Sequence, residues 1–276
     1  MMDRRKFAAA ILALATGSSL RGPGAQAETA GPVVCTIVKD AESGQTLVHE
    51  GPCADRHSPC SSFKFAIAVM GFDAGILTGP HDPVIKYRPE FGTANDPASV
   101  QKDVDPAIWL RDSIVWYSQQ ITKRLGQARF ESYVRQFNYG NEDVSGTPGE
   151  DGLTHAWLMN SLAISADEQS SFLSNFLNRR LGVSAGAYRL TRESLPSYAG
   201  EDGWTVHGKS GSGWLRNKAG QIDKSRPQGW FMGWGERGGR TVQFVRFQLG
   251  TQPSATPGGT LSRNFILQNL ASLADG

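Results

Sequence analysis

A serine and a lysine three positions apart, Ser61 and Lys64, are the first pair in this sequence that could do chemistry. On a helix, residues i and i+3 lie on one face and can touch. A serine hydroxyl is a weak nucleophile until a neighbouring base takes its proton, and a lysine can serve as that base when apolar surroundings suppress its charge. The flanking sequence "SSFKFAI" offers such surroundings. Because S-x-x-K is common by chance, a helix start with a solvated lysine stays open as the alternative.

Three later groups could complete a site: Ser113-Ile114-Val115, Tyr139-Gly140-Asn141 and Lys209-Ser210-Gly211. Each also has an ordinary explanation. The serine of the first group could be a helix N-cap, and the second group could be a simple turn. The glycines around the third group would let a substrate lie close against a strand. Its "GKS" lacks the earlier glycine that a phosphate-binding loop requires.

The elements that must position these groups are strands at both ends of the chain. In 35–51, two β-prone runs flank a polar turn, and in 229–249, aromatic and β-branched runs surround the turn sequence "GERGG". Strands at both ends around a helical centre predict an α/β (α+β) fold. We expect a mixed antiparallel sheet built from both chain ends, flanking helices and an inserted all-helical lobe.

The middle of the chain has helical signals. Asp105-Pro106 is a good start for a helix, and Ser165 with Glu168 forms a capping box for a helix that should end at Gly182. The run "FAIAVMGFDAGIL" is apolar on every side, which predicts a helix buried within the core.

The first 27 residues are typical of an export signal. A basic head, "MMDRRKF", precedes an apolar stretch too short to span a bilayer, and "AQA" fits a cleavage site before Glu28. The Arg4-Arg5 pair also suits a twin-arginine signal, so export by either the Sec or the twin-arginine route to the periplasm is expected. An uncleaved membrane anchor is the alternative. The expected organisation is a signal peptide, 1–27, and a single catalytic domain, 28–276, with its sheet lobe at about 28–60 and 190–276 and its helical lobe at about 61–189.

Export permits disulfides, and the chain has three cysteines, Cys35, Cys53 and Cys60. Cys53 and Cys60 flank the short loop "ADRHSP", so a bond between them is the first to test. The alternative is three buried thiols, since free cysteines are often buried.

Composition and spacing argue against several classes of partner. The net charge is only +2 and the basic residues are scattered, which does not favour nucleic-acid binding. The five histidines show no paired metal-ligand spacing, so we expect no metal. They are His49, His57, His81, His155 and His207.

Taken together and in this order, S-x-x-K, S-x-V, Y-G-N and K-S-G resemble the class D β-lactamases, the oxacillinase family of penicillin-recognising serine enzymes. The resemblance covers essentially the whole chain after the signal. It includes "FDAGIL", "HAWLMNSLAISADEQ" and a late arginine in "LSRNFILQNL". The resemblance implies a fold like that of the serine β-lactamases and transpeptidases, and a hydrolase that opens β-lactam antibiotics through an acyl-enzyme. Its expected binding partner is a small-molecule β-lactam. Its expected oligomeric state is a monomer or a homodimer.

The resemblance also assigns roles. Ser61 matches the acylated nucleophile, and Lys64 matches the general base, which carbon dioxide converts to N6-carboxylysine; no other cofactor is implied. Ser113 matches the hydroxyl that passes a proton toward the lactam nitrogen, and Trp157 matches the tryptophan whose indole N–H steadies the carbamate. The residues that match the family's substrate-binding groups are Lys209, Ser210, Gly211 and Arg263. The backbone N–H groups of Ser61 and Trp214 match the two oxyanion donors. The expected apolar wall residues are Val115, Trp109 and Leu158.

Two other functions stay open from the sequence: a receptor that stays acylated, and a cell-wall transpeptidase. Receptors of this kind are tethered to long membrane segments, and transpeptidases usually carry asparagine where this chain has Val115. In the K-S-G group and after the nucleophile, this chain carries Ser210 and Ser62 where the family more often has threonine, which keeps the hydroxyl and loses a methyl group.

Overall fold

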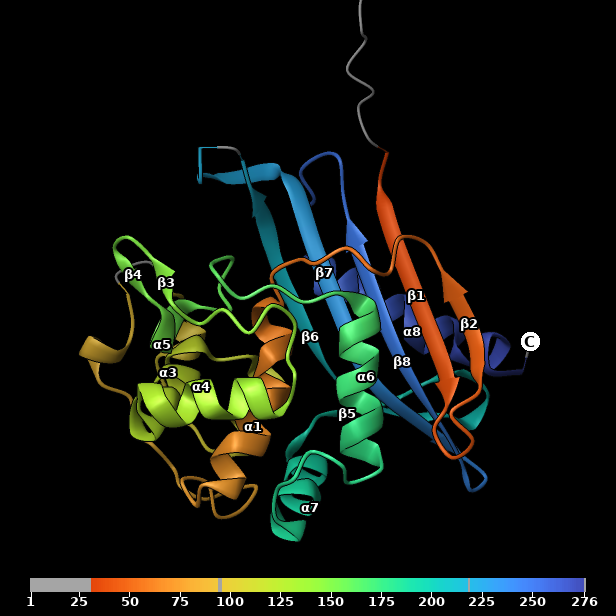
Figure 1. The fold of residues 1–276 in the computed structure, drawn as a ribbon, viewed down its shortest axis with the longest axis horizontal. Coiled ribbons are helices and arrows are strands. Elements are labelled where there is room, and N and C mark those ends of the chain that lie inside the picture. Colours follow the sequence, from red (N-terminus) through yellow and green to blue (C-terminus); the bar gives the residue numbers. More distant parts are fainter. Residues whose placement is uncertain (1–30, 94–95, 218, 276) are drawn as a thin grey trace, which may run out of the picture. The chain divides into compact units, whose positions relative to one another are not determined.

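A six-stranded sheet forms the centre of the computed structural model, which describes residues 31–93, 96–217 and 219–275 (Figure 1). The strand order is β2-β1-β8-β7-β6-β5, and every neighbouring pair is antiparallel. The strands are β1 (Val33–Asp40), β2 (Thr46–Glu50), β5 (Ser197–Ala199), β6 (Thr205–Arg216), β7 (Ile222–Arg237) and β8 (Arg240–Leu249); β3 (Gly146–Thr147) and β4 (Glu150–Asp151) form a separate small hairpin. The expected signal peptide, 1–27, lies outside the described residues.

The pairing of β1 with β8 joins the two ends of the chain in one sheet, which confirms the predicted fold class. Both predicted turns are present. Gly44 closes the β1–β2 hairpin with a φ of 74°, and Gly238 and Gly239 close the β7–β8 hairpin with φ values of 57° and 85°. Left-handed backbone of this kind suits glycine, which has no Cβ to clash.

Helices cover both faces of the sheet (Figure 1). Helix α8 packs on β6, β7 and β8 from behind, whereas α6 packs on β8 and β1 from the front. The helices are α1 (Lys64–Asp73), α2 (Pro106–Asp112), α3 (Val115–Leu125), α4 (Gln127–Gln136), α5 (Gly152–His155), α6 (Ala166–Leu177), α7 (Ala185–Ser194) and α8 (Gly258–Asp275), with 3₁₀ turns η1 (Cys60–Phe63), η2 (Pro89–Phe91), η3 (Ala98–Val100) and η4 (Glu201–Gly203).

The helix starts follow the sequence more closely than the ends do. Asp105 accepts from the backbone N–H of the third helical residue of α2, and Ser165 and Glu168 form the predicted capping box of α6. Helix α6 ends at Leu177, earlier than the predicted Gly182. The reason is local, because Arg179 already has a left-handed φ of 56°, which interrupts the helical hydrogen bonds.

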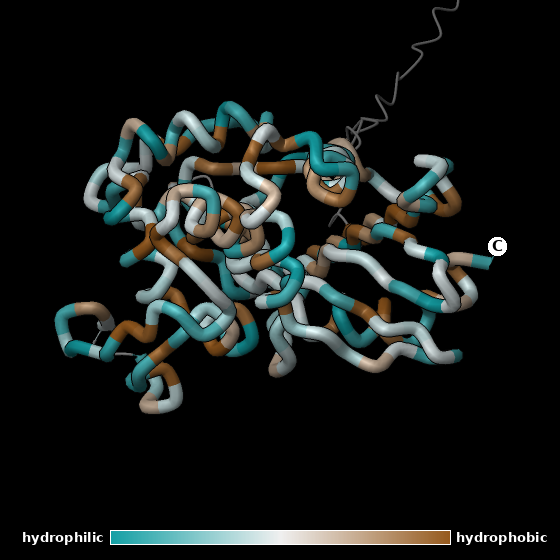
Figure 2. Tube along the Cα trace, turned by 90° about the horizontal axis from the view of Figure 1, so that it is seen from below, coloured by the Kyte–Doolittle hydropathy of each residue, from teal (hydrophilic) through white to brown (hydrophobic). Residues whose placement is uncertain are grey.

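Two hydrophobic cores lie on opposite faces of the sheet. The smaller core fills the space between the sheet and α8, and the larger joins the sheet to α1 and the other helices. Helix α1 is buried from Lys64 to Phe72, as its all-round apolar sequence predicted. In Figure 2 much of the hydrophilic chain lies on the outside, which agrees with this division. Among the described residues, no helix is both long and apolar enough to cross a membrane.

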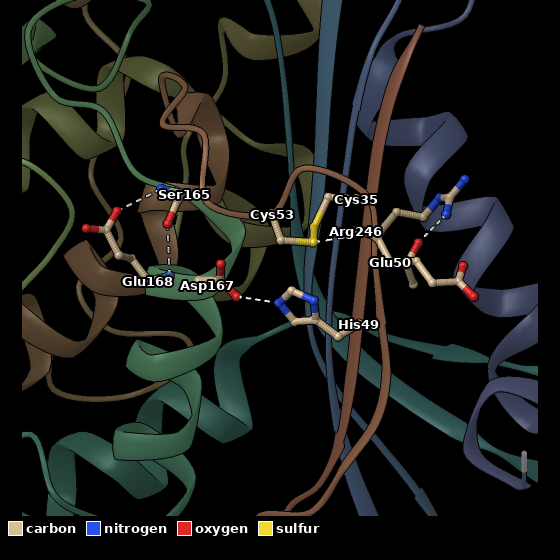
Figure 3. The surroundings of a disulfide bond; sticks show 9 residues. Cys35, His49, Glu50, Cys53, Ser165, Asp167, Glu168 and Arg246 are labelled. Carbon is tan, nitrogen blue, oxygen red and sulfur yellow. Dashed lines mark hydrogen bonds and ion pairs between the residues drawn. A yellow bond between two sulfur atoms is a disulfide. The ribbon is translucent and has the colours of Figure 1, made fainter.

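The predicted Cys53–Cys60 disulfide is wrong. The bond joins Cys35 and Cys53, with their Cα atoms 5.3 Å apart, and Cys60 is a free, buried thiol. The hairpin explains the pairing, because β2 returns antiparallel to β1 and brings Cys53 back beside the start of β1. Figure 3 shows this bond between β1 and the beginning of α6, close to the hydrogen bond between the side chains of His49 and Asp167.

The disulfide closes a loop with a sequence separation of 18 residues. We predict that the double substitution Cys35→Ser/Cys53→Ser lowers the free energy of unfolding by about 3 kcal/mol, because the open chain has more entropy when unfolded. Urea unfolding with and without reductant measures this. Reductant should destabilise the wild type and leave the double variant unchanged. Equal sensitivity of both proteins would contradict the assignment.

Candidate active site

Ser61 and Lys64 meet where η1 runs into α1. The Lys64 side-chain nitrogen, Nζ, lies 2.7 Å from Ser61 Oγ. Ser61 is half-buried, whereas Lys64 is fully buried at the first position of α1, and the six residues that follow it, 65–70, are all apolar and buried. Burial lowers the Lys64 pKa well below its usual value, and the positive charge of Lys209 lowers it further. A neutral amine in hydrogen-bond contact with a hydroxyl can take that hydroxyl's proton.

Lys209 on β6 reaches the same place from the sheet. Its Nζ donates to Ser113 Oγ at 3.0 Å and to the backbone carbonyl of Ser210 at 3.0 Å. Burial, and then the nearby Arg263 guanidinium, lower the Lys209 pKa to about 7. The lysine therefore changes charge near neutral pH, where it faces both a hydroxyl and the second lysine of the site.

Ser113 lies between two helices, as the break in the sequence indicated, although it is not the N-cap of α3. It ends α2 with a left-handed φ of 59°, and Ile114 occupies the N-cap position. A left-handed residue other than glycine is strained and persists where the surroundings hold it. Here the hydrogen bond from Lys209 helps to hold the hydroxyl in the site. Val115 begins α3 and is half-buried.

Gly211 brings β6 against the turn that carries Ser61. A Cβ added there would lie 2.6 Å from the Pro59 carbonyl oxygen and 3.2 Å from the Ser61 backbone nitrogen. Any side chain would push the strand away from η1. This glycine is required because the turn itself approaches the strand closely, whereas the sequence suggested that the glycines make room for a substrate.

The Trp214 N–H does not serve as the second oxyanion donor in this structure, contrary to expectation. It points to Met159 Sδ, 3.2 Å away. N–H groups alternate between the two edges of a strand, and that of Gly208 points to the edge that pairs with β5, where it donates to the Pro196 carbonyl. Ser212 lies between them with the same parity, so its N–H faces the same edge of β6. Sequence spacing alone could not distinguish Ser212 from Trp214, because both share that edge.

Trp157 is fully buried in an aromatic cluster next to the lysine. Its ring lies 5.7 Å from that of Phe63, the residue before Lys64. Its indole Nε1–H has no hydrogen-bond partner within the described part of the chain. An unpaired buried donor lowers the stability of the folded protein by about 1–3 kcal/mol. An acceptor placed within hydrogen-bond distance of this N–H would remove that loss. A carbamate on Lys64 would be such an acceptor.

The other expected site residues fall into two sets. Arg263 on α8 stacks over Tyr198, with 5.1 Å from its guanidinium carbon to the ring centre, and its charge acts on Lys209. Leu158 is half-buried beside the larger core. Trp109, by contrast, has no exposed surface, and its indole donates to Ser118 Oγ at 2.8 Å. It therefore packs in the core and does not line the site.

Tyr139 and Asn141 are structural, as the sequence indicated. Tyr139 is fully buried, and its hydroxyl donates to the Gln169 side chain at 3.4 Å. Asn141 closes its turn by donating to the Ser161 carbonyl and accepting from the Ala163 N–H. Within residues 31–93, 96–217 and 219–275, no three His, Cys, Asp or Glu side chains gather as a metal site.

Comparisons with known proteins agree with this geometry. Residues 34–269 match the family described as "Penicillin binding protein transpeptidase domain". β-Lactamase OXA-9 of Klebsiella pneumoniae is 51% identical over 240 residues, 87% of each chain. β-Lactamase OXA-1 of Escherichia coli is 32% identical over 205 residues, 72% of this chain and 69% of its own. The solved structure of OXA-427, a class D β-lactamase, superposes with a TM-score of 0.77 at 36% identity, covering 88% of this chain and 97% of that one.

The lowered Lys209 pKa predicts a pH dependence of stability. Between about 7 and the usual 10.5, the unfolded chain binds a proton at this lysine that the native protein lacks. Stability should therefore rise with pH across this window, by at most about 1.4 kcal/mol per pH unit from this group, and Lys64 adds a slope of the same sign.

Urea unfolding from pH 7 to pH 10 in buffer free of carbon dioxide measures this slope. Lys209→Met should flatten it, whereas Lys123→Met, which removes an exposed lysine, should leave it as in the wild type. An unchanged slope in Lys209→Met would show that this lysine is not buried with a lowered pKa.

Proposed function

The chain belongs to the class D β-lactamases and is a serine β-lactamase, and we propose that Ser61 is the residue that its substrates acylate. The observation that carries the proposal is the 2.7 Å contact between Ser61 Oγ and the fully buried Lys64 Nζ. It supplies the nucleophile and a group that can accept its proton, at the edge of a strand that can hold the substrate.

Acylation begins when Ser61 Oγ loses its proton toward Lys64 and attacks the lactam carbonyl. The carbonyl oxygen becomes an oxyanion, for which the backbone N–H groups of Ser61 and Ser212 are the proposed donors. When the C–N bond breaks, the lactam nitrogen needs a proton. Ser113, hydrogen-bonded to Lys209, is placed to deliver it. The product is an ester between Ser61 and the opened lactam.

The residues around Lys64 suit the reaction of its side chain with carbon dioxide. The chemistry requires an uncharged amine, which burial supplies at Lys64, and a donor that steadies the carbamate. The Trp157 Nε1–H, which has no partner among the described residues, can be that donor. When bound as N6-carboxylysine, carbon dioxide supplies the general base for acylation and for the attack of water on the acyl-enzyme.

The substrate carboxylate is proposed to bind between Lys209, Ser210 and Arg263. The two cations come from β6 and α8, and the charge of Arg263 already acts on Lys209. The Arg263 Nε–H is buried without a partner among the described residues, so it too can donate to a ligand. Arginine binds carboxylates with paired, directional hydrogen bonds. Val115 and Leu158 remain the proposed apolar wall.

We further propose that the protein is exported to the periplasm and cleaved after residue 27. The basic, apolar and small-residue segments of the N-terminus support this. Expression of the full chain in a Gram-negative host should yield a periplasmic protein whose N-terminal sequence starts at Glu28. A membrane-bound protein that keeps its first residues would contradict it.

The central test is turnover of a chromogenic cephalosporin such as nitrocefin. Ser61→Ala and Lys64→Ala should each reduce kcat/KM by at least about 10³-fold, because nucleophile and base act as a unit. Added bicarbonate should raise the wild-type rate after removal of carbon dioxide, and acid should lower it as the carbamate decomposes.

Thermal unfolding of both variants serves as the folding control. Full activity of Lys64→Ala would refute this lysine as the base. Stable acylation of wild-type Ser61 without turnover, seen by mass spectrometry, would instead indicate a penicillin receptor.

A further inference from the structure

Ser58 is a small polar residue three positions before the nucleophile, and it holds together three parts of the site. Its hydroxyl donates to the Trp157 carbonyl at 2.9 Å and accepts from the Met159 N–H at 2.9 Å. Its own carbonyl accepts from the Trp230 indole on β7 at 2.9 Å. One half-buried residue thus binds the turn at 157–159 to the nucleophile segment and the sheet.

We propose that Ser58 is a positioning residue for the proposed carbamate on Lys64, acting through Trp157. The inference rests on the proposed function, because it concerns how the indole donor is held for that group. Ser58 touches no reacting atom itself.

The 157–159 turn needs such a support. Met159 has a left-handed φ of 55°, which is strained for a residue with a side chain. The turn is held from both sides: Ser58 binds it from the nucleophile segment, and Trp214 and Arg216 of β6 bind Met159 through their N–H groups. A strained conformation of this kind persists only when several independent contacts hold it.

The hydroxyl is suited to this place because it donates and accepts at the same time. It satisfies a carbonyl and an N–H of the turn that have no partner within the turn itself. Alanine would satisfy neither group, and the turn would lose both of its hydrogen bonds to the Ser58 hydroxyl. Because Trp157 is fully buried, a shift of its backbone moves the indole relative to Phe63 and the neighbouring Lys64.

The affinity of Lys64 for carbon dioxide is the quantity that tests the proposal. The full-length mature protein, freed of carbon dioxide, is titrated with ¹³C-bicarbonate, and the lysine carbamate is measured by its ¹³C NMR signal. In Ser58→Ala the bicarbonate concentration at half-occupancy should rise about tenfold, the scale of one lost hydrogen bond. Ser58→Thr keeps the hydroxyl and should return to within about threefold of the wild type.

Ser184→Ala is the matched control. Ser184 is an N-cap whose hydroxyl accepts from the Ala187 N–H at the start of α7, so its loss destabilises a helix without touching the 157–159 turn. It should leave half-occupancy unchanged. If Ser58→Ala does not fold, Ser58→Cys retains a weak donor of similar size, and its half-occupancy should lie between those of the wild type and a tenfold shift.

The outcomes separate this inference from the proposed function. No carbamate in the wild type would overturn the Lys64 step and this inference with it. A carbamate in the wild type with the same half-occupancy in folded Ser58→Ala or Ser58→Cys would overturn the inference alone. An equal shift in Ser184→Ala would show that lost stability, and not the position of Trp157, causes the effect.

Discussion

The burial of the Lys64 amine is the constraint on which the rest of this structure depends. A lysine in water is charged and cannot accept a proton from serine, whereas desolvation favours the neutral form. The fold achieves this by placing Lys64 at the start of α1, a helix surrounded by other elements on all sides. The burial is unfavourable for stability at neutral pH, so the cores must offset it. This exchange of stability for reactivity is common at active sites.

A second consequence is that the site must be built where elements meet. Ser61 comes from a 3₁₀ turn, Ser113 from the junction of two helices, and Lys209 from a strand. Gly211 allows the strand to approach the turn closely, and the positive charge of Lys209 lowers the Lys64 pKa further. Cys60, before the nucleophile, is buried with a left-handed φ of 50° and accepts from the Gln228 amide at 3.3 Å. Its pKa is raised to about 11 by burial, so it stays a neutral thiol that packs behind the site.

The same arrangement explains why the support around the site is spread over the chain. Ser58 joins β7 to the turn at 157–159, and the disulfide between Cys35 and Cys53 fixes the segment that leads into it. Neither connection is local in sequence. A site of this kind requires rigid backbone on both sides, because small shifts of a base or a donor reduce its efficiency.

The sequence by itself determined the features that depend on local spacing and composition: the strands at both ends, the buried α1, the caps at Asp105 and Ser165, and the motif residues that identify the family. The tertiary structure decided what depends on which distant segments meet. It paired Cys53 with Cys35 because β2 runs back along β1. It directed the Trp214 N–H to Met159, and it enclosed Trp109 in the core. It also placed Ser58 between the 157–159 turn and β7, since a hydroxyl or a carbonyl acquires its role only from the groups that folding brings within about 3 Å of it.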